Sequence, residues 1–411
     1  MSLNKRKIIN DPVYGFITIP SELIFDLIEH AYMQRLGRIK QLGLTYLVYP
    51  GAQHTRLQHA LGAMHLMAQA LEVLRSKGAD ISNQEAEAVT IAILLHDIGH
   101  GPFSHTLEKL LIRGISHESL SIRMMENLNK AFNGSLTLAL QIFQGKYHKP
   151  FLHQLVSSQL DMDRLDYLNR DSFFTGVAEG VIGYDRIIKM LTVKNNELLV
   201  ESKGMYSIEK FLISRRLMYW QVYLHKTVLA AEQMLVKIIR RAHQISSLRK
   251  LEATPALLWF LEKNRDDSSW TDQDELIDRF AELDDTDIIS SIKMWKNESD
   301  PVLSWLSRHL LLRKLFKIEL STKPFDETLI AMIKEKVQQH SNIEVHDIHY
   351  FVFTETTSNH AYSPRSGPIN ILYKDGTVKD VADASDLLNI HVLEAPVVKY
   401  LLCYPKEMAE R

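Results

Sequence analysis

The stretch IAILLHDIGHGPFSH, Ile91–His105, decides the fold of this chain. Upstream of it, Ser82 and Glu85 have the spacing of a helix-capping box, which places the start of a helix just after Ser82. Residues 88–95 then include Ala88, Val89 and Leu95 and leave no polar face. Because a helix that is apolar all round is a buried helix, the sequence predicts a helix in the interior of the protein.

The last turn of that helix carries His96 and Asp97, and Gly99 with Pro102 ends it. An imidazole and a carboxylate therefore sit next to each other in the interior. An Asp is almost never fully buried without a partner, and an unpaired buried charge is costly. Two interpretations stay open for the dipeptide alone. The two side chains satisfy each other or neighbouring backbone groups, or they bind a metal ion.

The composition narrows the class of protein. The chain has 411 residues, enough for two or three domains. Its 48 Lys plus Arg balance 50 Asp plus Glu, so no large field draws it to nucleic acid or to an anionic membrane. The 18 His residues stand out, since His is the commonest metal ligand.

The same composition predicts a cytoplasmic protein without a membrane segment. The single cysteine, Cys403, excludes an internal disulfide and suits a reducing compartment. No apolar run approaches the ~18 residues of a membrane span. The first ten residues have no apolar core of a secretory signal.

Hydrophobic periodicity predicts a mainly α protein. Residues 8–20 are typical of a short hairpin or an extended arm, and Thr45–Pro50 of a short strand. Helical patterns cover Leu57–Lys77, Phe151–Arg170 and much of Tyr206–His243. We expect a helical core over residues 1–245, a helical extension over residues 246–313 and a small α+β domain over residues 314–411.

The pattern after Arg313 alternates as strand, helix, two strands, helix and strand. That βαββαβ order is the ferredoxin-like arrangement. It predicts antiparallel pairing between the strands near Ile348–Thr354 and Ile369–Tyr373.

A second group of polar residues lies on the predicted helix of DMDRLDY. Asp163, Asp166, Tyr167 and Arg170 fall at i, i+3, i+4 and i+7, so they share one face. A solvated face with an ion pair explains this spacing as well as a binding site does. His59, near the start of another helix, lies off its apolar stripe and is on its own more typical of a surface or capping histidine.

Taken together, His59, His96, Asp97 and Asp163 offer two imidazoles and two carboxylates from three helices. We expect them to bind one divalent ion. Mixed nitrogen and oxygen ligands suit Mn²⁺, Fe²⁺, Ni²⁺, Zn²⁺ or Mg²⁺ and do not decide among them. An octahedral ion with four protein ligands keeps two places for water and a phosphoryl oxygen, which it can polarise.

The order of several long motifs resembles a known family. NDPVYGFI, QRLGRIKQLG, YPGAQHTRLQHALG, HDIGHGPFSH, DMDRLDYLNRD and YLHK occur in this order within residues 8–245. This pattern resembles the HD-domain metal-dependent phosphohydrolases, and within them the dNTP triphosphohydrolases that in animals follow a SAM domain. No SAM segment is expected here. The resemblance implies that residues 1–245 form an HD catalytic domain.

The resemblance also implies a role for each matching residue. Metal ligands would be His59, His96, Asp97 and Asp163. Groups that handle protons would be His100, His105, Glu108 and His117. The triphosphate would be bound by Arg56, Arg164 and Arg215. Contacts to sugar and base would come from Gln41, Leu42, Tyr167, Asp171 and Tyr223. The family usually has Lys at the position of Arg164, so a point charge becomes a bidentate fork.

One departure concerns regulation. The effector-regulated relative has Arg where this chain has Gly37, and Asp where this chain has Glu29. Nucleotide-driven assembly of a tetramer is therefore not predicted, although a homo-oligomer, a dimer or higher, is expected.

The leading hypothesis is hydrolysis of dNTP to deoxynucleoside and triphosphate. The alternatives are hydrolysis of GTP, guanosine tetraphosphate or a nucleoside monophosphate, and a non-catalytic nucleotide sensor or single-strand nucleic-acid binder. Arg56, Arg164 and Arg215 favour a polyphosphate over a monophosphate. The complete set of metal ligands argues against a sensor, and the near-zero net charge argues against nucleic acid.

Overall fold

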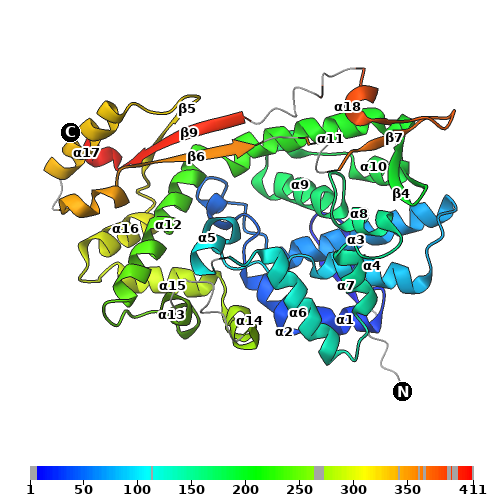
Figure 1. Ribbon diagram of the computed structural model, residues 1–411, viewed down its shortest axis with the longest axis horizontal. Helices are drawn as coiled ribbons and strands as arrows, with labels where there is room; N and C mark the ends of the chain where they lie inside the picture. The colour runs from blue at the N-terminus through cyan, green and yellow to red at the C-terminus, as the bar shows by residue number, and fades with distance from the viewer. Residues whose placement is uncertain are drawn as a thin grey trace.

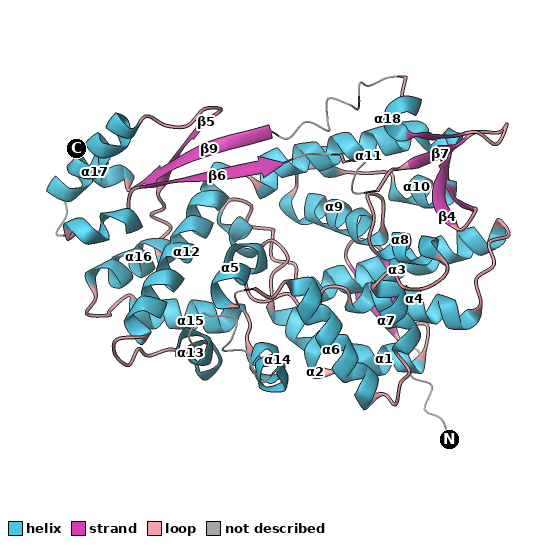
Figure 2. Ribbon diagram, in the orientation of Figure 1, coloured by secondary structure: helices cyan, strands magenta, loops and turns pink. Residues whose placement is uncertain are grey.

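Helices make up most of the molecule, and most of the strands lie along one side of the helical body (Figures 1 and 2). In this computed structural model the described residues are 7–112, 114–262, 273–340, 343–359, 362–363, 367–386, 390 and 397–409. Among them, none of the helices combines the length and hydropathy that a bilayer-spanning segment needs.

The part of the chain before residue 250 is a helical unit with two hairpins. Its helices are α1 (Glu22–Glu29), α2 (Ala31–Arg35), α3 (Arg56–Ser76), α4 (Asn83–Leu95), α5 (Ser104–Leu111), α6 (His117–Ala131), α7 (Thr137–Phe143), α8 (Pro150–Val156), α9 (Met162–Thr175), α10 (Tyr184–Met190), α11 (Met205–Met218) and α12 (Lys226–Ser246). Its antiparallel hairpins are β1 (Ile8–Asp11) with β2 (Gly15–Thr18) and β3 (Leu191–Lys194) with β4 (Glu197–Glu201). The hairpin expected near the N-terminus is confirmed, whereas the β3–β4 hairpin was not predicted.

The predicted buried helix is α4. Ser82 and Glu85 form the capping box that starts it, and residues 88–95 are buried. Its neighbour α3 also begins with a capping box, made by Thr55 and Gln58. α3 packs against both α4 and α9. His59 near the start of α3, His96 at the end of α4 and Asp163 at the start of α9 contact one another, so these three helix ends meet at one place.

Two local expectations were wrong. Gly43–Leu47 forms a 3-10 helix instead of the strand expected over Thr45–Pro50. Gly43 has a left-handed φ of 49° and begins this 3-10 helix, which continues through Thr45–Leu47 of the expected strand. The helix expected over Phe151–Arg170 is broken between α8 and α9, because Asp161 caps the start of α9.

The helical extension packs on α12. It consists of α13 (Pro255–Glu262), α14 (Gln273–Glu282), α15 (Asp285–Trp295) and α16 (Pro301–Leu311). Both α13 and α16 contact α12, and α14 contacts α2 of the first unit. The extension therefore reaches the segment that follows α2, which carries several of the predicted site residues.

The C-terminal part is α+β, as expected. It contains β5 (Lys317–Ser321), α17 (Glu327–Gln339), a 3-10 helix (Val345–Tyr350), β6 (Phe353–Asn359), β7 (Asn370–Leu372), β8 (Val378–Asp380), α18 (Val381–Ala384), β9 (Val397–Tyr404) and α19 (Lys406–Ala409). These strands belong to two sheets. One has the order β5-β9-β6, and the other has the order β3-β4-β7-β8.

The strand pairing predicted for this part was wrong. Val345–Tyr350 is helical, β6 pairs with β9, and β7 pairs in parallel with β4 through Val200 and Ile371. The alternation of side chains sets the faces of a strand but not its partner. The edge of β4, which belongs to the first unit, provides a partner for β7 that the C-terminal sequence does not reveal.

Candidate functional site

A pocket of about 570 Å³ lies where the ends of α3, α4, α9, α11 and α12 meet. The structure brings most of the predicted site residues to its wall: Gln41, Leu42, Arg56, His96, Asp97, His100, His117, Asp163, Arg164, Tyr167, Asp171, Arg215 and Tyr223. His59 lies directly behind His96 and is fully buried. Glu108 contacts His117 from α5. The side chain of His105 lies outside the described part of the chain.

The two imidazoles predicted to bind metal have their orientation fixed by hydrogen bonds. His59 Nδ1 lies 2.7 Å from Asp166 Oδ2, and His96 Nδ1 lies 2.6 Å from the carbonyl oxygen of Ile93. Both partners can only accept while Asp166 is ionised, so each Nδ1 carries a proton and Nε2 is the nitrogen of each ring that is left to bind a metal ion. This is the arrangement that metal-binding histidines use.

The two Nε2 atoms face the carboxylate of Asp163. Asp163 Oδ1 lies 3.1 Å from His59 Nε2 and 3.5 Å from His96 Nε2, and the two nitrogens are 3.3 Å apart. One ligand atom from each of these three side chains lies within 4.8 Å of the others. The three predicted ligands from α3, α4 and α9 therefore converge.

Asp97 lies beside this group without completing it. Its Oδ1 is 3.2 Å from His96 Nε2, but its Oδ2 accepts a hydrogen bond from Arg56 Nη1 at 2.6 Å and is 3.8 Å from His59 Nε2. The carboxylate thus faces both the imidazoles and a guanidinium. A rotation about the side-chain bonds of Asp97 would exchange its contact with Arg56 for a closer approach to the two imidazoles.

The electrostatics of the group favour positive charge at the imidazole nitrogens. Burial alone would lower the pKa of His59, but the carboxylates of Asp163 and Asp166 raise that pKa to about 10. Burial would raise the pKa of Asp163, but hydrogen bonds from His59 and His96 hold that pKa below its ordinary value. The site therefore fits a cation.

The predicted proton-handling residues lie next to the metal ligands. The rings of His100 and His117 are stacked with their centroids 4.1 Å apart. His100 Nε2 is 3.3 Å from Asp97 Oδ1, and Glu108 Oε1 is 3.0 Å from His117 Nδ1. Burial and the charge of Arg56 hold the pKa of His100 well below its ordinary value, so this imidazole is neutral at pH 7.

A glycine permits the approach of α6, which carries His117. A Cβ added to Gly99 would lie 2.2 Å from the carbonyl oxygen of His117 and 2.3 Å from the amide nitrogen of Ser121. Only glycine therefore allows the turn after α4 to lie against the start of α6. Ser121 Oγ also accepts from the Gly99 N–H and donates to the carbonyl of His96.

Three arginines surround the pocket. Arg56 Nη1 contacts Asp97, Arg164 Nη1 contacts Asp161, and Arg215 Nη1 donates to Gln159 Oε1 at 3.1 Å. The Nε atom of each of these arginines is buried and has no hydrogen-bond partner within the described residues. The pocket wall therefore combines positive charge with donors able to contact anionic oxygens.

Aromatic side chains also line the pocket. Tyr167 lies one helical turn after Asp163, and its ring centroid is 6.3 Å from that of Tyr223. Asp171 is nearly fully buried, and it accepts from the hydroxyl of Tyr223 at 2.7 Å and contacts His54 Nε2 at 2.7 Å. The carboxylate of Asp171 is therefore held in place by two side chains.

Sequence reasoning missed several residues of the site. Asp166 was expected to share a face with Asp163 and possible ion-pair partners. It does pair with Arg170 at 2.9 Å, but it also orients His59. Its position in the buried half of α9 was the available signal. Glu232 of α12 also lines the pocket, where burial raises its pKa to about 7. The sequence around it gives no such indication.

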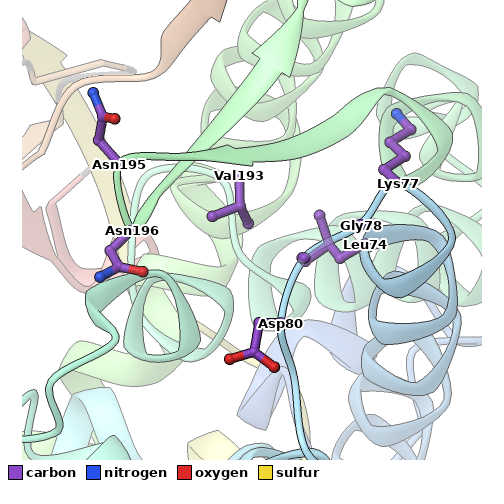
Figure 3. A pocket seen from close by; sticks show the side chains of 8 residues that line it. Leu74, Lys77, Gly78, Asp80, Val193, Asn195 and Asn196 are labelled. Atoms are coloured by element: carbon purple, nitrogen blue, oxygen red, sulfur yellow. The ribbon is translucent and has the colours of Figure 1, made fainter.

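A second pocket, of about 340 Å³, lies between the turn after α3 and the turn of the β3–β4 hairpin (Figure 3). Lys77, Asp80, Asn195 and Asn196 contribute to its wall. The ammonium of Lys77 already contacts the Glu201 carboxylate at 2.7 Å and two backbone carbonyls. None of the predicted site residues lines this pocket.

Two family models match the chain. The model of the HD domain matches residues 56–170, and that of the HD associated region matches residues 182–256. The first match spans all four predicted metal ligands and both stacked histidines. The second spans Arg215, Tyr223 and all of α12.

Similar proteins match over most of the chain. A phosphohydrolase from Bacteroides thetaiotaomicron has a solved structure that is 53% identical, with a TM-score of 0.94, over 97% of this chain and 99% of that one. The uncharacterized protein YwfO of Bacillus subtilis is 30% identical over 99% of this chain and 94% of its own length.

The deoxynucleoside triphosphate triphosphohydrolase SAMHD1 homolog of Dictyostelium discoideum is 30% identical over 59% of this chain. The match covers 51% of that protein, so the likeness spans about half of its length.

Proposed function

Because this chain belongs to the HD-domain metal-dependent phosphohydrolases, we propose that it hydrolyses deoxynucleoside triphosphates to a deoxynucleoside and triphosphate. The relative whose name states this activity covers only part of this chain, so the substrate rests on the pocket itself. In the proposed reaction, the oxygen of water bonds to the α-phosphorus. The bond from that phosphorus to the 5′ oxygen breaks, and the leaving oxygen takes a proton.

The observation that carries this proposal is the group of three arginines around one pocket. Arg56, Arg164 and Arg215 supply three positive charges next to the predicted metal ligands, and each has a buried Nε–H without a partner in the described structure. A buried donor without a partner is costly. A triphosphate offers anionic oxygens and negative charge on three phosphoryl groups along its length, so three guanidinium groups favour it over the single phosphoryl group of a monophosphate.

The residues fit a divalent ion. The proposed ligands are His59 Nε2, His96 Nε2 and a carboxylate oxygen each of Asp97 and Asp163, since hydrogen bonds at Nδ1 already hold both imidazoles in the required tautomer. When bound, such an ion polarises a phosphoryl oxygen and lowers the pKa of water. Its identity stays a prediction, and manganese is our first choice among the candidates.

The stacked pair His100 and His117 is proposed to move protons. His100 is neutral at pH 7 and can accept a proton. His117 Nδ1 lies 3.0 Å from Glu108 Oε1, which orients the imidazole. We therefore assign proton donation at the 5′ oxygen to His117, oriented by Glu108. His105 is proposed to assist on the evidence of the family pattern alone.

The sugar is proposed to lie against Tyr167 and Leu42. Tyr167 follows Asp163 by one turn, so it lies within the length of a nucleotide from the phosphates. The ring of Tyr167 and the isobutyl group of Leu42 give a 2′-hydroxyl no hydrogen-bond partner. Burying that hydroxyl without a partner costs on the order of 1–3 kcal/mol. Asp171 with Tyr223 is assigned to the 3′-hydroxyl, and Gln41 to the sugar or base.

A nucleotide panel tests the proposal. The metal-loaded protein is incubated with the four dNTPs, the four NTPs, dGMP and guanosine tetraphosphate, and products are separated by ion-exchange chromatography. The proposal expects deoxynucleoside and intact triphosphate, and no product from the Asp163→Ala variant. Monophosphate with pyrophosphate, or equal rates for GTP and dGTP, would reject it. Binding without any hydrolysis would favour a nucleotide sensor.

The division of the chain and its assembly are also proposals. We propose a catalytic domain over residues 1–245, a helical extension over 246–313 and an α+β domain over 314–411, in which β7 extends a sheet of the first domain. We also propose a homo-oligomer. Light scattering after size-exclusion chromatography measures its mass directly.

A further inference from the structure

A single carboxylate of the helical extension joins two segments of the pocket wall. Asp285, the first residue of α15, is buried. Its Oδ2 accepts from the N–H of Lys40 at 2.9 Å, and its Oδ1 accepts from the N–H of Phe103 at 3.3 Å. Lys40 directly precedes Gln41 and Leu42, and both Lys40 and Phe103 line the pocket. The two hydrogen bonds of Asp285 thus connect the segment proposed to contact the sugar with the turn that follows the HD motif.

The backbone at Phe103 is strained. Its φ is 47°, in the left-handed region that residues with a side chain adopt only where their surroundings hold them. Its ring is buried and lies close to Gly43. The hydrogen bond to Asp285 is therefore one of the contacts that keep the end of the turn in this conformation.

Neighbouring residues of the extension support the same turn. Phe280 of α14 lies against Gly101, where an added Cβ would be 3.1 Å from the ring, and it covers the guanidinium of Arg35 at 4.6 Å. Arg35 is fully buried and donates to the carbonyl oxygen of His100 at 2.8 and 2.9 Å. The backbone from His100 to Phe103 is thus held by contacts that involve α14 and α15.

Asp284 adds a second contact between the helical extension and the segment before Gln41. Its Oδ2 accepts from Arg38 Nε at 2.5 Å, two residues before Lys40. Asp284 also caps α15 together with Asp287, which accepts from the Asp284 N–H at 2.9 Å. Among the described residues, Asp285 therefore contacts both pocket segments, Asp284 contacts Arg38 next to one of them, and Asp287 contacts only its own helix.

We propose that Asp285 is a positioning residue for hydrolysis, which holds the turn before Phe103 and the segment Lys40–Leu42 at the spacing that the nucleotide requires. The residue lies beyond the two family matches, which end at residue 256. A displacement of about 1 Å at a reacting group can cost on the order of a hundredfold in rate. The identity of the nucleotide in this inference rests on the proposed function.

The test compares Asp285→Ala and Asp285→Asn with the control Asp287→Ala. For each variant, kcat and KM are measured with dGTP and GTP, and rates are expressed per bound metal. Asp285→Ala is expected to lower kcat on the order of a hundredfold and to bring the ratio of kcat/KM for dGTP and GTP towards one. Asp285→Asn keeps one acceptor oxygen and should fall between this variant and the wild type.

The ratio separates positioning from folding. A smaller folded fraction lowers both rates equally and leaves the ratio of dGTP to GTP unchanged. Asp287→Ala removes a cap of the same helix, so it should lower the melting temperature without changing that ratio. If Asp285→Ala has the same kcat, and the same ratio of kcat/KM for dGTP and GTP, as Asp287→Ala, the inference is wrong. If the Ala variant does not fold, Asp285→Asn decides by the same criteria.

A second substrate separates this inference from the proposed function. Bis(p-nitrophenyl) phosphate with Mn²⁺ reports phosphoester hydrolysis without a sugar. If the wild type hydrolyses this ester but no dNTP, the proposed substrate is wrong, and Asp285 is then judged by the rate on the ester per bound metal. A fall in that rate in Asp285→Ala, absent in Asp287→Ala, supports positioning, and unchanged rates overturn it.

Discussion

The metal-binding group and the C-terminal strands are built from different kinds of contact, between side chains on buried helices in the first and between strand edges in the second. His96 is oriented by a carbonyl three residues before it, and Asp163 and Asp166 come from successive turns of one helix. In contrast, β7 pairs with β4, and β6 pairs with β9. The first region depends on the spacing of residues along buried helices, whereas the second depends on which strand edge is available.

This difference indicates that the buried helices determine catalysis and that the C-terminal sheet contributes to stability. The buried helices α3, α4 and α9 bring the metal ligands together and leave little freedom in their orientation. The sheet β5-β9-β6 lies against α12, at the other end of the molecule from α3 and α4 (Figure 1). We therefore expect substitutions in the first region to change catalysis and substitutions in the second to change stability.

The largest effect is expected from Asp163→Ala. This change removes the carboxylate that faces both Nε2 atoms, so hydrolysis should fall to the background of the assay while the fold persists. Asp185→Ala on the exposed surface of α10 is the matched control and should keep full activity. Circular dichroism checks the fold of both variants. Measurable turnover in Asp163→Ala would remove this residue from the metal site.

Asp166→Asn should have the next largest effect. The Asp166 carboxylate fixes the tautomer of His59, and loss of such a partner typically costs 10–100-fold in metal affinity or activity. Titration of the metal-free variant with Mn²⁺ measures the affinity. Saturating metal should restore part of the rate. An affinity equal to that of the wild type would show that Asp166 serves only its ion pair with Arg170.

Tyr167→Ala tests the sugar side of the pocket. The wild type should prefer dGTP over GTP by roughly ten- to a hundredfold, because an unpaired 2′-hydroxyl costs on the order of 1–3 kcal/mol. The variant should lose this preference as well as rate. Tyr206→Ala, at an exposed tyrosine, is the control. If the preference survives in Tyr167→Ala, the sugar lies elsewhere in the pocket.

The smallest effect on catalysis is expected from Leu402→Ala in β9. Leu402 is fully buried, and a Leu→Ala change in a core typically costs 2–5 kcal/mol of stability. The melting temperature should fall, while kcat at temperatures well below melting should not change. Val398→Ala, at an exposed position of the same strand, should change neither. A lower kcat in Leu402→Ala would mean that the sheet contributes to the pocket.

Much of the site followed from sequence because helix periodicity and buried polarity are local properties. The capping box at Ser82 and the placement of His96 at the end of a buried helix needed no distant contact. The conformation of the Asp97 carboxylate could not be predicted in this way, because it depends on a contact with Arg56 of another helix. The role of Asp285 depends on the packing of the extension against two loops, which no local pattern records.

The partner of each C-terminal strand could not be predicted from the sequence either, because strand pairing also depends on distant contacts. The βαββαβ order gives each strand a length and two faces, but it does not select β4 as the partner of β7 or β9 as the partner of β6. Asp166 marks an intermediate case. Its face was predicted, yet a buried carboxylate that pairs with Arg170 and also orients His59 has two uses that the spacing alone does not separate.

The most direct test of the account is the metal stoichiometry of the wild type and of Asp97→Ala. Asp97 is the one predicted ligand whose carboxylate lies outside the group formed by His59, His96 and Asp163. Metal-free protein is titrated with Mn²⁺ by calorimetry, and elemental analysis follows gel filtration. We predict about one equivalent in the wild type and its loss in Asp97→Ala. No bound metal in the wild type, or an unchanged affinity in Asp97→Ala, would contradict the four-ligand site.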